Sequence, residues 1–295
     1  MPAGFKLPLD FGGAGATGVN SRGGITISDG DYNPEKIQID ADPDLFAGYN
    51  PAHSQGDILS NVTGVVSYSF NSYEVLVTEA VTVTTDVLRV ELDGGTVRQA
   101  DLLDYPQTTE PGSEPIRLFS SDPAHFYQAQ SGWVSSTGAA PTHEAAFMPV
   151  GGQRDHVMRD GQDTLAVPFE WTGPDGITIR RTYTFHRGQY AVQVSDQVVN
   201  KGSEPWQGYV YRQLVRVPPV IETGFTKPES YSFHGAAWYS PADKFDKRKF
   251  EDFAEDGPLD KQVTGGWIAM LQHHFFSAWI PGPGDAGTFS LATTR

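Results

Sequence analysis

The sequence has no cysteine in its 295 residues, no long apolar run and few basic side chains. The missing cysteines exclude disulfide frameworks, thiolate zinc sites and cysteine nucleophiles. No window approaches 18 consecutive apolar residues, and the N-terminus MPAGFKLPLDFGG lacks the basic-then-apolar layout of a signal peptide. We therefore expect neither a membrane-spanning helix nor a secretion signal in this chain.

Basic side chains are outnumbered by acidic ones, with 21 Lys and Arg against 36 Asp and Glu, which gives a formal net charge of −15. Association with a phosphate backbone or an anionic lipid surface would add repulsion instead of releasing counterions. The charge therefore argues against a nucleic-acid partner.

Aromatic residues are abundant, at 12%, together with 32 glycines and 21 prolines. This composition favours a folded, mostly β protein, and the length allows one large β domain or two smaller ones. From residue 81 onward, alternating segments bounded by turn residues predict a large antiparallel sandwich. Its expected strands are residues 81–84, 87–92, 165–171, 177–186, 190–200, 206–217 and 267–280, with turns at 93–95, 173–176 and 187–188.

One short helix is predicted between the expected strands at 206–217 and 267–280. Ser240 can cap it, Pro241 suits its first position, and Phe245, Phe250 and Phe253 form an apolar stripe among mixed charges. We expect this helix to lie over an edge of the sandwich.

The first 80 residues have a different character, because they begin with the glycine-rich run FGGAGATGVNSRGG. Short alternating segments at 25–27, 36–39, 62–70 and 73–77 predict a small antiparallel sheet or barrel. Three basic and nine acidic residues give residues 1–78 a net charge of −6, which is a poor surface for gripping DNA.

Three segments are specific enough to carry a family resemblance: FHGAAWYSPADKFDKRKFEDFAEDGPLDKQVTGGWIAMLQHHFFSAWIP at 233–281, YQAQSGW at 127–133 and VELDGGTVRQADLLDYP at 90–106. They resemble the large periplasmic domain of the YidC membrane protein insertases of Gram-negative bacteria, over about residues 81–295. The resemblance implies a β-supersandwich of the galactose-mutarotase type. It also implies a periplasmic location, with anchoring in the inner membrane through segments absent from this chain.

The same resemblance implies a non-enzymatic role, with no catalytic residue, cofactor or metal. The domain would be a scaffold or docking surface whose partners are SecDF and other components of the Sec translocon. The best candidate surface lies between Gln193 and Pro241, where exposed strand edges and the Pro218-Pro219 break would accept a partner. The family's domain continues through further strands, so we expect this chain to stop short of the last part of the sandwich and leave an open sheet edge.

Residues 25–79, and the segment GDILSNVTGVVSYSFNSYEVLVTE in particular, resemble the OB-like module of ExeM-type extracellular nucleases. This resemblance implies a fusion of two proteins, with the seam at about residues 79–83. The alternative is that these strands extend the main β domain, since no Pro/Ser-rich linker marks a boundary. A secreted nuclease accessory module is therefore one alternative function, although the acidic charge opposes it.

Residues that could carry chemistry form no recognisable motif. Ser131 lacks the G-x-S-x-G frame of a hydrolase nucleophile, and His273 and His274 would point to opposite faces of a predicted strand. The spacing of Asp29, Asp31 and Asn33 resembles the start of a calcium loop, but Pro34 replaces the required glycine, so an ordinary acidic turn is the simpler interpretation.

The other alternative function is a mutarotase-like sugar-binding or epimerase domain, in which a histidine and a carboxylate act as acid and base. Candidate residues for such a pair are His125, His186 and His234 with Glu144, Glu170 or Glu222, for which structural roles are the simpler interpretation. Aromatic residues could line a groove for a sugar or a peptide, but most should pack in the core. They cluster at Phe126, Tyr127 and Trp133, at Tyr231, Phe233, Trp238 and Tyr239, and at Trp267, Phe275, Phe276 and Trp279.

Overall fold

The computed structural model describes residues 80–220, 232–253, 255–272 and 274–293, together with the backbone of seven short strands before residue 80. The chain forms two compact units, Met1–Val81 and Thr82–Arg295. Within the described residues no helix is long and apolar enough to cross a membrane.

The part of the first unit that the structure describes consists of short strands. In its three-stranded sheet, β6 pairs antiparallel with β7, whereas β4 pairs with β7 in parallel. The expectation of a purely antiparallel sheet is therefore wrong for this pair. The predicted acidic turn at Asp29 lies outside the described residues. So do the side chains of residues 25–79, the segment that carries the OB-like resemblance. The strands are β1 (Phe5–Lys6), β2 (Gly18–Val19), β3 (Ile25–Thr26), β4 (Ile37–Asp40), β5 (Ile58–Leu59), β6 (Gly64–Ser69) and β7 (Ser72–Val77).

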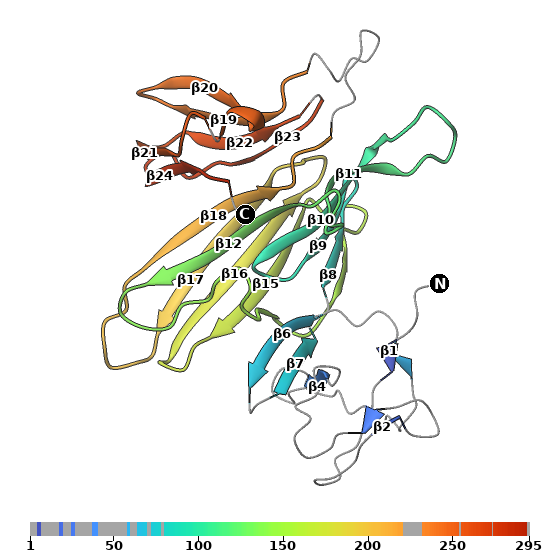
Figure 1. The fold of residues 1–295 in the computed structure, drawn as a ribbon, viewed down its shortest axis with the longest axis vertical. Coiled ribbons are helices and arrows are strands. Elements are labelled where there is room, and N and C mark those ends of the chain that lie inside the picture. Colours follow the sequence, from blue (N-terminus) through green and yellow to red (C-terminus); the bar gives the residue numbers. More distant parts are fainter. Residues whose placement is uncertain are drawn as a thin grey trace. The chain divides into compact units, whose positions relative to one another are not determined.

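The second unit is built on a seven-stranded sheet (Figure 1). Its strand order is β14-β8-β9-β10-β12-β18, and β11 pairs with β10. All pairs are antiparallel except β14 with β8, which is parallel. The strands are β8 (Val81–Thr84), β9 (Leu88–Leu92), β10 (Thr96–Pro106), β11 (Pro115–Phe119), β12 (Tyr127–Ser135), β14 (Asp155–Val157) and β18 (Gly208–Arg216).

A four-stranded sheet faces it, in the order β13-β15-β16-β17, with strands β13 (Met148–Pro149), β15 (Thr164–Thr172), β16 (Ile177–His186) and β17 (Val192–Asn200). In β16 every second residue is buried, from Ile177 to Phe185, because a strand directs alternate side chains to opposite faces. Together the two sheets form the predicted β sandwich, with an apolar core that includes the fully buried Val81, Val83 and Val167.

A third group of strands follows at the C-terminal side. A four-stranded sheet in the order β20-β19-β22-β23 is accompanied by the pair β21-β24. Buried Trp238, Leu259, Phe289 and Leu291 form its own small core. The strands are β19 (Gly235–Ser240), β20 (Lys244–Lys249), β21 (Leu259–Thr264), β22 (Trp267–Leu271), β23 (Phe276–Trp279) and β24 (Ala286–Leu291).

The helix predicted from Ser240 is wrong in position. Ser240 does cap the following backbone, since its Oγ accepts the N–H of Asp243 at 2.9 Å, but this closes the hairpin between β19 and β20. Lys244, with φ of 66°, ends that turn. Residues 244–249 then form β20, an edge strand whose residues are mostly exposed. Phe250–Phe253 form a single turn of 3-10 helix, η2. A cap and a proline suit a tight turn as well as a helix start.

The single strand expected at 267–280 is a hairpin instead, since β22 and β23 pair antiparallel and Gln272 donates its N–H to the carbonyl of Phe275 at 2.9 Å. His274 therefore lies in a turn and not on a strand, and His273 lies outside the described residues. The segment contains no glycine, proline, asparagine or aspartate to signal the turn, which lies at the polar residues Gln272 and His274.

Gly94 gives a test of how tightly the sandwich is packed. Its φ is +82°, and a Cβ there would lie 3.0 Å from Phe147 Cγ and 3.1 Å from Phe169 Cδ1. Gly112 has nearly the same φ, +80°, with no atom within 4 Å of such a Cβ. We expect Gly112→Ala to cost about 1 kcal/mol of unfolding free energy for the left-handed backbone alone. Gly94→Ala should cost about 1–3 kcal/mol more because of overpacking. Urea unfolding of both variants checks this, and equal losses would contradict it.

Candidate functional site

The sugar-chemistry candidates do not converge. His125 pairs with Asp122 at 3.2 Å on the surface, and His186 Nδ1 lies 3.2 Å from Thr164 Oγ1. Glu170 pairs with Arg180 at 2.9 Å. The contacts of His125 and His186 are thus with Asp122 and Thr164 and not with Glu144 or Glu170, and Glu222 lies outside the described residues.

A metal-binding site is not supported either. Within the described residues, no group of three or more His, Cys, Asp or Glu side chains is placed to hold a metal ion. Ser131, already doubtful as a nucleophile, is buried and donates its Oγ–H to the carbonyl of Tyr211 at 3.2 Å. That hydroxyl is a structural group.

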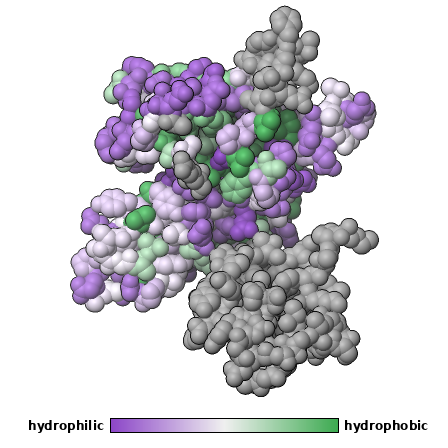
Figure 2. Space-filling view, in the orientation of Figure 1, coloured by the Kyte–Doolittle hydropathy of each residue, from purple (hydrophilic) through white to green (hydrophobic). Residues whose placement is uncertain are grey.

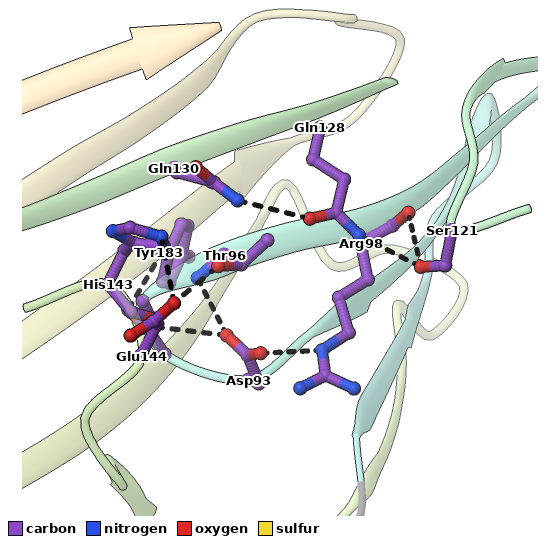
Figure 3. A network of polar contacts seen from close by, with 11 residues as sticks. Asp93, Thr96, Arg98, Ser121, Gln128, Gln130, His143, Glu144 and Tyr183 are labelled. Carbon is purple, nitrogen blue, oxygen red and sulfur yellow. Dashed lines mark hydrogen bonds and ion pairs between the residues drawn. The ribbon is translucent and has the colours of Figure 1, made fainter. Parts of the chain in front are cut away.

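A row of amides crosses the two adjacent strands β12 and β18. Gln213 Nε2 donates to Gln130 Oε1 at 2.7 Å, and Gln130 Nε2 donates to Gln128 Oε1 at 3.3 Å. Gln128 Nε2 then donates to Ser121 Oγ at 2.9 Å (Figure 3). The amides bond chiefly to one another, so the row ties strands together.

His143 stands at the other side of this network and was not among the predicted residues (Figure 3). Its Nδ1 lies 2.7 Å from Tyr211 Oη, which also accepts the His143 N–H at 2.9 Å. Its carbonyl accepts the Thr96 hydroxyl at 3.5 Å. The neighbouring Glu144 is 3.9 Å away and mostly exposed. The loop sequence Thr142-His143-Glu144 has no motif, so only the fold reveals these contacts.

The edge of β18 contacts the third group of strands. Trp279 Nε1 on β23 donates to the Gln213 carbonyl at 3.0 Å, and the Arg212 guanidinium lies 5.6 Å from the Trp279 ring centroid. Nearby, Tyr127 Oη hydrogen-bonds to Ser277 Oγ, and Arg216 lies 4.7 Å from the Tyr127 ring. Burial lowers the pKa of both arginines.

Burial also raises the pKa of Tyr127 to about 12. Of the aromatic residues predicted for a groove, Tyr127 and Trp238 are buried, and most of the other described ones are half-buried. Phe276 is an exception, with 65% of its surface exposed. Tyr231 lies outside the described residues. The aromatic clusters thus belong mainly to cores and junctions, as the sequence suggested.

The predicted docking range from Gln193 to Pro241 covers β17, β18 and β19. β19 is buried almost throughout, and residues 221–231 lie outside the described residues. The accessible parts are β17, most of whose residues are exposed, the loop at 201–205, Tyr209 and Val210 on β18, and the segment at 217–220 with the Pro218-Pro219 break.

Arg181 on β16 and Asp196 on β17 are neighbours in the four-stranded sheet, and they form an ion pair that is buried in the interior of the sandwich. Arg181 Nε and Nη2 donate to the two carboxylate oxygens of Asp196 at 2.7 and 2.8 Å, and their side chains are 0% and 5% exposed. Arg181 Nη1 reaches across to the carbonyls of Ser131 at 2.7 Å and Gly94 at 3.2 Å. Trp133 Nε1 donates to Asp196 at 2.9 Å from the facing sheet.

Burial by itself would lower the pKa of Arg181, but the hydrogen bonds to Asp196 outweigh it and the pKa is raised. The arginine therefore stays charged, and each of its three side-chain nitrogens has an acceptor. The arrangement fixes the spacing of the sheets and offers no free group for chemistry.

These observations define a β-sandwich module held by internal polar networks, with no metal-binding group of three or more His, Cys, Asp or Glu side chains in its described part. A family model described as the YidC periplasmic domain matches residues 80–295, and the chain belongs to this family. A second model, a domain of unknown function (DUF8508), matches residues 9–86. The family is one of periplasmic domains, which places this chain in the periplasm.

Two relatives illustrate the similarity, both named membrane protein insertase YidC. One, from Xanthomonas euvesicatoria pv. vesicatoria, is 50% identical over 218 residues, which are 72% of this chain and 37% of the relative. Another, from Stenotrophomonas maltophilia, is 52% identical over 204 residues, which are 69% of this chain and 36% of the relative. The chain thus spans little more than a third of the length of these relatives.

The Arg181–Asp196 pair should be essential for stability. We expect Asp196→Asn to lower the unfolding free energy by about 3–5 kcal/mol, because it leaves a buried guanidinium without its counter-charge. The adjacent pair Arg180–Glu170 has the same partner types but is 48% and 38% exposed, so Glu170→Gln should cost less than about 1 kcal/mol. Chemical denaturation of the two variants makes the comparison, and similar losses would refute it.

Asp101 on β10 is a second buried carboxylate, 1% exposed in its side chain. It accepts from Arg117 Nε at 2.8 Å, Arg89 Nη2 at 2.9 Å and Gln99 Nε2 at 3.0 Å. Burial alone would raise the pKa of Asp101, but these hydrogen bonds, with Arg117 contributing most, bring it below the usual 3.8.

This pKa predicts acid sensitivity. A carboxylate with a lowered folded-state pKa contributes stability that is fully present above about pH 3.8 and is lost as the pH falls through the folded value. Asp101→Asn should therefore cost about 1–3 kcal/mol at pH 7 and make unfolding less dependent on pH below 3.8. Urea titrations between pH 7 and pH 2 measure both effects. Parallel stability–pH curves for the native chain and the variant would be the contrary result.

Proposed function

We propose that the chain is the non-catalytic periplasmic domain of a membrane protein insertase and acts as a docking surface for the Sec machinery. The observation that carries this proposal is its membership of the YidC periplasmic domain family, whose relatives bear the name membrane protein insertase. The insertion step itself belongs to the parts of such proteins that this chain does not match.

The proposed partners are SecDF and other components of the Sec translocon. The inner membrane would hold the domain through segments outside the described chain, so that the domain faces partners in the periplasm. A role of this kind needs an accessible surface and no reaction centre. Both the internally satisfied polar networks and the scattered histidines are consistent with it.

The accessible part of the predicted range provides a suitable surface. Tyr209 is 66% exposed and lies directly opposite Val134, which is 57% exposed, on the neighbouring strand. Tyrosine combines a large apolar ring with a polar end, and such residues are enriched at the centres of protein interfaces. We place the centre of the docking surface at Tyr209 on β18 and include in the surface β17, the edge strand of the facing sheet.

The other functions considered for the sequence gain no specific support. An epimerase would need one of the candidate histidines to face one of the candidate glutamates, whereas His125 contacts Asp122, His186 contacts Thr164 and Glu170 pairs with Arg180. A nucleic-acid module would need a basic groove, whereas the chain carries a net charge of −15.

Co-purification with SecDF in mild detergent tests the proposal, using the full chain of residues 1–295. We expect the native chain to retain SecDF and Tyr209→Glu to weaken retention by about tenfold or more, as for the loss of a central interface residue. Val157→Glu is the matched control, because Val157 is 63% exposed on β14 at the opposite edge of the same sheet. Failure of the native chain to retain SecDF would overturn the partner assignment. Equal weakening by both variants would overturn the surface.

A further inference from the structure

We propose that the outer edge of β17 binds its partner by strand addition, taking an extended polypeptide segment as a fifth strand of the four-stranded sheet. This inference rests on the proposed docking function and names how the partner is held. It follows from a comparison of the edge strands of the second unit, which differ in how well they are protected against pairing with another strand.

Most outer strands of the unit are short, charged or covered. β13 has two residues and ends in Pro149, and β14 has three residues. β20 carries Lys244, Lys247, Arg248 and Lys249 along its length. β24 is uncharged, but it has only six residues and contains Gly287. The edge of β18 meets Trp279. Short edges and edge lysines are common ways to prevent strand pairing.

β17 has none of these protections. It has nine residues, VQVSDQVVN, with no proline and no basic residue. Its single charge, Asp196, is turned inward to Arg181 and is 5% exposed. In Figure 2 the region over β17, at the lower left, is pale, whereas the region over β20, at the top, is strongly hydrophilic. No described strand other than β16 pairs with β17.

The register shows which peptide groups are available. Lys201 donates its N–H to the Gly176 carbonyl at 3.0 Å, on the β16 side. Peptide groups alternate in direction along a strand, so those of Ser195 and Gln197 also point toward β16. Those of Val194, Asp196 and Val198 point away from it. None of these three N–H groups has a hydrogen-bond acceptor among the described residues.

Side chains beside this edge indicate what the added strand should carry. Trp133 faces β17, since it donates to Asp196, and Val210 lies directly opposite Trp133 on the neighbouring strand. Residues in register share a face of the sheet, so Val210 also faces inward, yet it is 37% exposed, and Val198 is 36% exposed. Apolar residues at alternate positions of an added strand would cover these two valines.

The outward face sets fewer demands. Gln193, Ser195 and Gln197 are exposed and uncharged, and Val199, 40% exposed, is the one apolar residue on this face of β17, so most of the partner's outward residues can be polar. A second copy of this chain is a poor occupant, because two chains of net charge −15 would repel each other. The occupant that fits is an extended, neutral or basic segment of another polypeptide with apolar residues at every second position.

An end-blocked, fluorescein-labelled peptide of eleven residues, with valine at every second position and threonine or lysine between, is the probe. Its binding to the full chain is followed by fluorescence anisotropy. The same peptide with two valines replaced by proline is the control for non-specific binding, since proline interrupts strand pairing.

Val198→Pro removes an N–H that points outward and keeps every hydrogen bond to β16. We expect it to weaken binding of the probe by tenfold or more, whereas Val198→Thr, which keeps the N–H, should stay within about threefold of the native chain. Ser195→Lys is a second variant for the case that the proline disturbs folding, because it places a charge on the same edge. It should weaken the probe at least fivefold.

The proposal is overturned if the native chain binds neither peptide, if it binds both equally, or if the Val198 variants bind the probe alike. The test is separable from that of the docking function. Retention of SecDF by Val198→Pro at the native level would uphold docking and overturn strand addition. Edge-dependent binding of the probe without retention of SecDF would uphold the edge site and overturn the partner assignment.

Discussion

The buried guanidinium of Arg181 is the constraint around which the sandwich is arranged. A charge with no access to water must have a counter-charge and a full set of acceptors, and here they come from both sheets. Asp196 supplies the charge, while the carbonyls of Gly94 and Ser131 supply the remaining acceptors from the facing sheet. The pairing therefore sets the register of β16 with β17 and the distance between the sheets at the same point.

The same ion pair also holds β17, whose other edge pairs with no described strand. Its inward positions are committed to the interior, with Asp196 held by Arg181 and Trp133. Its outward positions are uncharged and exposed, and β16 occupies one edge only. A strand fixed so firmly from within can present its free edge without needing a further strand for its own stability. Rigidity of this kind reduces the entropy lost when a partner binds.

Much of the fold could be predicted from local patterns, because alternation and turn residues act over a few positions. The predicted strand at 177–186 coincides with β16, and the glycines Gly94 and Gly176 of the predicted turns both have positive φ. The predictions failed where two structures share the same local signals, as at Ser240, whose cap closes a hairpin. The polar network was beyond prediction, since the contacts of His143 join residues 47 and 68 positions apart.

The indole of Trp133 makes the interior of the sandwich observable. It donates to Asp196 and lies 5.7 Å from the ring of Trp206, so its surroundings include both the buried ion pair and a second chromophore. Opening of the sandwich at this point would expose the indole to water and separate the two rings. The intrinsic fluorescence of the chain thus reports on the integrity of the ion pair, and separation of the sheets becomes visible without an added label.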